Sequence, residues 1–170
     1  MKATSNTSLP GVLIRPLESS DNALIAKIIR NALLEHGAAK PGTAYYDEST
    51  DAMSEAFNIE NSAYFIAESH EIVAGGAGIY PTEGLPEGVC ELVKMYLSPA
   101  FRGQGIARAL LDKTLEFARQ KGYRSVYLES MPELGRAVAV YEKMGFQQLD
   151  APMGNTGHFD CSIWMLKSLI

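Results

Sequence analysis

The sequence CELVKMYLSPAFRGQGIA, residues 90–107, decides the fold of this chain. Its first half is rich in residues that suit a pleated strand. Pro99 ends that strand, because proline has no N–H group to donate to a ladder. From Ile106 onward apolar residues recur at helical spacing, and Gly122 provides the stop signal. The stretch therefore predicts a strand that turns into a helix through a short glycine-containing loop.

Gly103 and Gly105 lie in this loop, directly before the predicted helix. Free N–H groups and the positive end of the helix dipole can hold a phosphate or pyrophosphate there. Glycine allows close approach of the ligand, and Arg102 adds a positive charge whose fork matches phosphate. The alternative is a tight turn that binds nothing. The chain has neither a G-x-x-x-x-G-K-[ST] loop nor G-x-G-x-x-G spacing, which disfavours a nucleoside triphosphate or a dinucleotide.

Length and composition predict one globular domain. The chain has 170 residues, of which 46% are hydrophobic and 21% charged, as in ordinary globular proteins. We expect a flexible segment over residues 1–10 and a single domain over residues 11–170. The net charge of -5 disfavours nucleic-acid binding. The absence of a long apolar run or a secretory signal disfavours a membrane partner and predicts a cytoplasmic location.

Hydrophobic periodicity and turn residues predict seven strands and four helices. The expected strands are residues 12–16, 63–67, 72–80, 90–97, 124–129, 146–149 and 161–166. The expected helices are one that Ser19 or Ser20 caps and Gly37 ends, one over 47–57, one over 106–118 and one over 137–144. This order predicts an α/β fold with a mixed, largely antiparallel sheet and helices on both faces.

The two cysteines, Cys90 and Cys161, both fall in strand-like runs. We expect each to be a reduced, buried, small apolar residue, with a catalytic thiol as the alternative.

Two motifs resemble those of the GCN5-related N-acetyltransferase (GNAT) family. Arg102, Gly105 and Ala107 match the family pattern [Q/R]-x-x-G-x-[G/A], and YEKMGF at residues 141–146 is similar to the Y-x-K-x-G-F ending of the family's last helix. The resemblance covers roughly residues 11–168. It implies a GNAT-type sheet of about seven strands, acetyl-CoA as co-substrate without a metal, and a primary amine of a small molecule or peptide as acceptor.

The resemblance also implies which residues hold acetyl-CoA. The pantetheine arm would follow the strand at Met95, Tyr96 and Leu97, in a slot opened by a splay from the strand at residues 126–129. The pyrophosphate would lie on the glycine loop, whose expected contacts are Arg102, Gly103, Gln104, Gly105, Ile106, Ala107 and Arg108. Many family members have an asparagine before the tyrosine, but residues 131–136 here read MPELGR. Ser130 or Arg136 is the expected substitute.

Acetyl transfer to an amine requires two proton movements. An alkylamine, with a pKa of about 10.4 for lysine, must lose a proton before it attacks the thioester. The resemblance makes Glu91 the candidate base, with a solvated surface carboxylate as the alternative. The departing thiolate, with a thiol pKa of about 8.5, benefits from an acid. Tyr141 is the candidate acid, with a tyrosine that only packs in the core as the alternative.

The acceptor is the least defined part of the sequence. Tyr45 and Tyr46 lie where the family often forms its acceptor pocket, and His158, expected to be exposed in a loop, is a third candidate. The leading hypothesis is an N-acetyltransferase that works by direct attack in a ternary complex. The alternatives are a non-catalytic acyl-CoA sensor or interaction module and an enzyme for a longer acyl donor. Both a monomer and a homodimer are consistent with the sequence.

Overall fold

The computed structural model describes residues 9–170 and contains one seven-stranded mixed sheet. In spatial order its strands are β1 (Val12–Pro16), β2 (Ala63–Ser69), β3 (Ile72–Tyr80), β4 (Val89–Leu97), β5 (Ser125–Ser130), β7 (Ile163–Ser168) and β6 (Gln147–Gln148). Only β4 and β5 pair in parallel, and all other neighbours are antiparallel. The predicted fold class is confirmed. Most of the expected flexible N-terminal segment, residues 1–8, lies outside the described residues.

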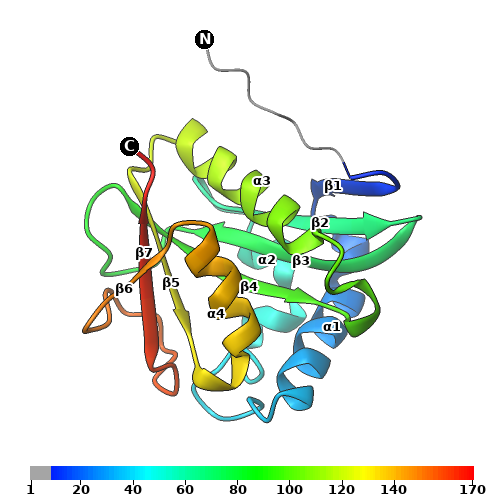
Figure 1. The fold of residues 1–170 in the computed structure, drawn as a ribbon, viewed down its shortest axis with the longest axis horizontal. Helices are drawn as coiled ribbons and strands as arrows, with labels where there is room; N and C mark the ends of the chain where they lie inside the picture. The colour runs from blue at the N-terminus through cyan, green and yellow to red at the C-terminus, as the bar shows by residue number, and fades with distance from the viewer. Residues whose placement is uncertain (1–8) are drawn as a thin grey trace.

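Helices cover both faces of this sheet (Figure 1). The α-helices are α1 (Asn22–Glu35), α2 (Met53–Ala56), α3 (Ile106–Gln120) and α4 (Gly135–Lys143). In Figure 1, α3 and α4 lie in front of the sheet, and α1 and α2 lie behind it. Short 3-10 turns occupy Ser19–Asp21, Glu48–Asp51, Pro99–Phe101 and Pro132–Leu134. None of the helices in residues 9–170 is long and apolar enough to cross a membrane.

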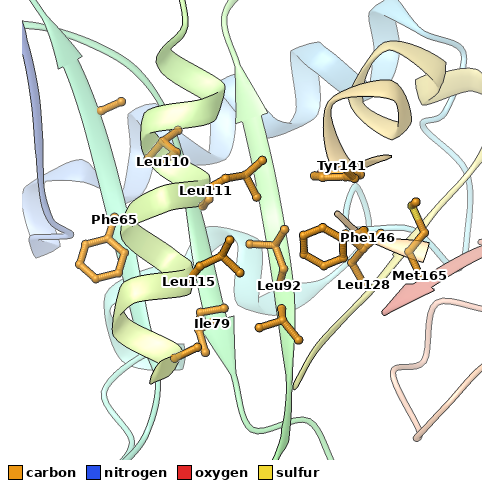
Figure 2. Packing of buried hydrophobic residues seen from close by; sticks show 14 of the residues in the cluster. Phe65, Ile79, Leu92, Leu110, Leu111, Leu115, Leu128, Tyr141, Phe146 and Met165 are labelled. Atoms are coloured by element: carbon orange, nitrogen blue, oxygen red, sulfur yellow. The ribbon is translucent and has the colours of Figure 1, made fainter. Parts of the chain in front are cut away.

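Each face of the sheet has its own apolar core. On one face, Leu110, Leu111 and Leu115 of α3 are almost fully buried and pack toward β3 and β4, as Figure 2 shows. On the other face, Ile25, Ile29 and Leu33 of α1 are completely buried. The buried residues of each helix recur at intervals of three or four residues, which gives each helix one apolar stripe, and that stripe faces the sheet.

Two helix predictions need correction. The helix that Ser19 or Ser20 is expected to cap begins at Asn22 with Asp21 as its N-cap, because a 3-10 turn over Ser19–Asp21 precedes it. The helix expected over residues 47–57 is broken at Ala52, whose backbone leaves the helical region. The buried hydroxyl of Thr50 donates to the Ala44 carbonyl at 2.8 Å. Directly after the break, the Ser54 N–H donates to Asn22 Oδ1 of α1 at 2.9 Å, a tertiary hydrogen bond that competes with the local helical pattern.

The C-terminal strands also differ from expectation. The last strand begins at Ile163, and β6 is reduced to Gln147–Gln148. Cys161 is half-buried in the preceding turn, where its N–H donates to the His158 carbonyl at 3.1 Å. Cys90 is buried in β4, as predicted.

A bulge in β4 links the fold to the site. Ala77 of β3 faces two residues, Lys94 and Met95, because the ladder steps from Gly76–Tyr96 to Gly78–Val93. Lys94 has a φ of 51°, uncommon for a residue with a side chain. The Tyr64 hydroxyl donates to the Lys94 carbonyl at 2.7 Å and holds this conformation. Gly76 makes room for that ring, since a Cβ there would lie 2.4 Å from Tyr64 Cε1.

Candidate active site

The two central strands separate at the middle of the sheet. β4 and β5 pair only from Val89 to Glu91, opposite Ser125 to Tyr127. Beyond that point β4 runs on to Leu97 and β5 to Ser130 without pairing with each other. The expected splay is therefore present, and it starts directly after Glu91.

A cavity of about 770 Å³ occupies this separation. Its walls come from β4, β5, the loop before α3, and α4, and they include Leu92, Met95, Leu128, Ala137 and Val140. A second cavity, of about 40 Å³, lies beside it and contains Glu91 and His158. The two cavities share the wall residues Leu92, Lys94, Tyr96, Glu129, Ser130 and Leu134. The site is thus a long groove with a small polar recess at its inner side.

The start of α3 presents free hydrogen-bond donors to the long cavity. Within residues 9–170, no backbone carbonyl accepts from the N–H groups of residues 103–108. Gly103 and Gly105 have φ values of 74° and 82°, in the left-handed region that favours glycine. A Cβ at Gly103 would meet no atom within 4 Å, so this side of the loop is open. The free N–H groups expected at this loop are therefore present, and the side chain of Ile106 is buried, so only its backbone faces the cavity.

Arg102 lines this cavity but its guanidinium is engaged within the protein. Its Nε and Nη2 donate to the Leu97 carbonyl at 3.1 and 2.9 Å, and its Nη1 pairs with Glu35 at 2.9 Å. Arg102 therefore ties the end of β4 to α1. The side chain of Arg108, which is 75% exposed, also lines the cavity. Sequence reasoning missed the positive charge of Lys143 on the opposite wall.

Glu91 is buried, which excludes the alternative of a solvated surface carboxylate. The Thr82 hydroxyl donates to its Oε2 at 2.5 Å. Burial raises the pKa of Glu91 to about 7, with the hydrogen bond from Thr82 opposing this shift and the charge of Glu129 adding to it. Because a general base works best when its pKa is near the working pH, this environment suits proton transfer.

Glu129 is a second carboxylate in the recess, and sequence reasoning missed it. The Tyr127 hydroxyl donates to its Oε2 at 2.7 Å, and the Thr156 hydroxyl donates to its Oε1. Glu91, Glu129 and His158 each offer one polar atom, and these three atoms lie within 4.8 Å of one another. Among the residues that the structure describes, this is the one group of three such side chains that could hold a metal ion.

Asp47 connects the recess to the loop before α2. Its Oδ2 accepts from Lys94 Nζ at 2.7 Å and contacts His158 Nε2 at 2.8 Å. Burial raises the pKa of Asp47, but hydrogen bonds from His158 and Lys94 and their charges outweigh it and lower the pKa to about 2. Burial lowers the pKa of His158, yet the bond to Asp47 raises it overall above 6.5. The expectation that His158 is exposed is wrong: its side chain is 18% exposed.

Tyr141 projects from α4 toward the long cavity and packs edge-on against Phe146, with ring centroids 5.9 Å apart (Figure 2). Burial raises the pKa of Tyr141 above its usual value of 10, so its hydroxyl stays protonated at neutral pH. Within the described chain this hydroxyl has no hydrogen-bond partner. Ser130 and Arg136, the expected substitutes for the missing asparagine, both line the same cavity.

Tyr45 and Tyr46 do not line either cavity. Tyr45 packs against Arg30 and Tyr46, and the Tyr46 side chain is largely exposed. Their neighbours Thr43 and Ala44 line the recess instead. We therefore give the two tyrosines no part in the acceptor site.

The cysteine thiols are poorly suited to nucleophilic catalysis. Burial raises the pKa of Cys90 and that of Cys161 to about 12, so both thiols stay protonated near neutral pH.

Comparison with known families decides the classification. Residues 30–146 match the family model described as "Acetyltransferase (GNAT) family". The chain belongs to this family. It is 37% identical over 166 residues to the Escherichia coli protein YjgM, an uncharacterised N-acetyltransferase. The aligned region covers 97% of this chain and 99% of that protein. It is 36% identical over 127 residues to rat N-acetyltransferase 8B, covering 73% of this chain and 54% of that one. The chain spans about half the length of such mammalian relatives.

Solved structures support the fold. An acetyltransferase of the GNAT family from Staphylococcus aureus Mu50 superposes with a TM-score of 0.80 at 17% identity, covering 94% of this chain and 99% of that one. The Salmonella typhimurium protein yncA, solved with its cofactor acetyl-CoA, superposes with a TM-score of 0.74 at 23% identity. The superposition covers 94% of this chain and 95% of that one. Both chains share the GNAT architecture described above.

We expect the Asp47→Asn substitution to lower the free energy of unfolding at pH 7 by about 3 kcal/mol, because it leaves the Lys94 ammonium buried without a counter-charge. The effect should be present above about pH 4, the pKa of an unfolded aspartate, and should vanish as the pH falls toward 2. Urea unfolding across this pH range measures it.

The matched control is Asp51→Asn, which removes a carboxylate that pairs with Arg30 but is 65% exposed. Its effect should be small, since exposed ion pairs contribute little. Equal losses for the two variants would contradict the buried role of Asp47.

Proposed function

We propose that this protein is an acetyl-CoA-dependent N-acetyltransferase that moves an acetyl group directly to a primary amine of a small molecule or peptide. One observation carries the proposal: two adjoining cavities with shared walls lie between the free N–H groups at the start of α3 and the carboxylates of Glu91 and Glu129 at the splay of β4 and β5. An anion-binding end and a proton-accepting end are what this bisubstrate reaction requires. The acetyl-CoA bound by the structurally similar yncA adds support.

The donor would enter along the splay. We place its pyrophosphate on the N–H groups of residues 103–108, with the charges of Arg108, Arg136 and Lys143 on the surrounding walls. The pantetheine arm would add to β4 from Met95 to Leu97, where β5 no longer pairs with the strand. Because the Leu97 carbonyl already accepts from Arg102, the arm would use the remaining backbone groups of this segment.

Glu91 is the proposed base. It would accept a proton from the acceptor ammonium, directly or through water, so that the neutral amine can attack the thioester carbon. Tyr141 is the proposed acid, and would donate its hydroxyl proton to the departing thiolate. Alignment of the amine and thioester in the groove would supply much of the remaining acceleration.

Calorimetric titration with acetyl-CoA, coenzyme A and ATP tests the donor assignment. We expect both coenzyme A species to bind and ATP to bind far more weakly, because the unpaired part of β4 offers backbone groups to a pantetheine arm, which ATP lacks. Release of free thiol on adding primary amines then tests transfer. Failure of acetyl-CoA to bind would contradict the proposal. Binding without thiol release would favour a coenzyme A-binding sensor on the same fold.

The Glu91→Gln substitution should lower kcat/KM for an amine acceptor by about 100-fold at pH 7. The loss should shrink as the pH rises toward 9.5, because more of the amine is then already deprotonated. In the unsubstituted protein kcat/KM should rise through about pH 7, where Glu91 loses its proton. Thiol release measured across this range checks both expectations. A loss of equal size at every pH would rule out Glu91 as the base.

The Tyr141→Phe substitution should lower kcat by about tenfold or more while the Kd for acetyl-CoA changes little. The ring packing against Phe146 is kept, and only the hydroxyl group that would donate the proton is lost. Kinetics and calorimetry on the same variant separate the two effects. An unchanged kcat would remove Tyr141 as the acid.

A further inference from the structure

Glu129 lies where the two cavities meet. Of the charged residues that line them, Lys94 and Glu129 line both, whereas Glu91 lines only the inner recess. The junction is where an acceptor in the recess would meet a thioester in the long groove. A charged side chain at this junction would therefore contact the reacting amine rather than a remote part of either substrate.

The Glu129 carboxylate is held in a fixed orientation. Tyr127 and Thr156 each donate a hydroxyl proton to a different oxygen of it. Tyr127 is itself fixed, because its oxygen accepts from the Met153 N–H at 3.1 Å. Each carboxylate oxygen keeps a second lone pair for a further donor. The side chain is therefore preorganised to accept hydrogen bonds and not only to fill space.

The junction holds one carboxylate that has no ion pair in the described part of the chain, although the His158 ring, whose pKa is raised, lies within 4.8 Å of it. Lys94, the cation that lines both cavities, is already compensated by Asp47 at 2.7 Å. Glu129, by contrast, has no ion pair among the described residues. A fixed, uncompensated carboxylate in a partly buried recess attracts a cation, and a protonated amine is the cation that the proposed reaction brings there.

We propose that Glu129 holds the ammonium group of the acceptor at this junction, and that the same amine gives up its proton to Glu91. This inference rests on the proposed function and adds to it a residue that binds the acceptor. The polar atoms of the two carboxylates lie within 4.8 Å of each other, so one ammonium group can contact both. In the proton transfer an N–H bond of the ammonium breaks, an O–H bond forms on Glu91, and the nitrogen lone pair becomes free to attack.

The pairing gives the two carboxylates different tasks. Burial raises the pKa of Glu91 first, and the nearby charge of Glu129 raises it further. Glu129 is thus both the anchor for the ammonium and one reason why Glu91 can hold a proton near neutral pH.

The kinetic test compares Glu129→Gln with Glu91→Gln, using tyramine, cadaverine, ethanolamine and a short peptide with a free N-terminus as acceptors. Glu129→Gln should raise KM for the amine by about tenfold with a smaller effect on kcat, because it removes a charge-assisted contact made before and during transfer. Glu91→Gln should act mainly on kcat. Glu129→Asp should recover part of the lost affinity. An unchanged KM in Glu129→Gln would overturn the assignment.

The pH dependence of kcat/KM distinguishes this role of Glu129 from a merely structural one, which would leave it unchanged. In Glu129→Gln the acidic limb of kcat/KM should lie at lower pH than in the unsubstituted protein, because Glu91 has lost its negative neighbour while the charges of His158 and Lys94, which lower its pKa, remain. Glu116→Gln is the matched control, since this glutamate lies on the surface of α3 and is 55% exposed. It should leave KM and the acidic limb unchanged. An acidic limb that stays in place in Glu129→Gln would contradict the pairing.

A titration without any substrate separates this inference from the proposed function. The carboxyl carbon of Glu91 is followed by NMR in protein labelled with ¹³C-glutamate, and its signal is the one missing in Glu91→Gln. Its apparent pKa should fall in Glu129→Gln, and an unchanged value would overturn the pairing whether or not acetyl-CoA binds. Calorimetry shows separately whether acetyl-CoA binds; failure to bind, or binding without acetylation of any of the four amines, would refute the proposed function and with it an acceptor role for Glu129, whatever the titration shows. Acetylation with an unchanged KM in Glu129→Gln would overturn the assignment of Glu129 and leave the proposed function standing.

Discussion

The separation of β4 from β5 after Glu91 is the constraint on which the site depends. A sheet that stayed paired along both strands would leave no groove and no free strand edge. The bulge at Lys94 and Met95 accompanies the separation, and its positive φ is an unfavourable conformation for lysine. Tertiary contacts stabilise it. Tyr64 bonds the Lys94 carbonyl, and Asp47 with Thr50 engages the ammonium.

The buried charge of Lys94 in the recess is likewise stabilised by a tertiary contact. A buried ammonium is costly unless paired, and the carboxylate that pairs with it here also holds His158. This arrangement fastens the loop before α2 and the loop before β7 to the same strand. Neither Glu91 nor Glu129 forms an ion pair within the described residues, although the charges of His158 and Lys94 lower the pKa of Glu91. An ion pair and two carboxylates without one thus lie side by side in the recess.

Much of this architecture could be predicted from local sequence. Strand and helix patterns identified the seven strands and the two long helices, and proline and glycine marked where they end. The glycine loop before α3 predicted free N–H groups, and the structure has them. Errors occurred where long-range contacts compete with local pattern. Ala52 interrupts the helix expected over 47–57, and Cys161 lies in a turn rather than in the last strand.

The sequence by itself determined the fold class, the glycine loop with its free N–H groups and the identities of Glu91 and Tyr141 as candidates, because each depends on a motif within a few neighbouring residues. Only the tertiary structure decided the composition of the polar recess. Asp47, Glu129 and His158 come from three separate segments, and no spacing in the chain relates them to Lys94. Their meeting depends on how two loops pack against the splayed strands, and hydrophobic periodicity carries no information about it. For the same reason the burial that raises the pKa of Glu91 could not be read from a strand that looks amphipathic.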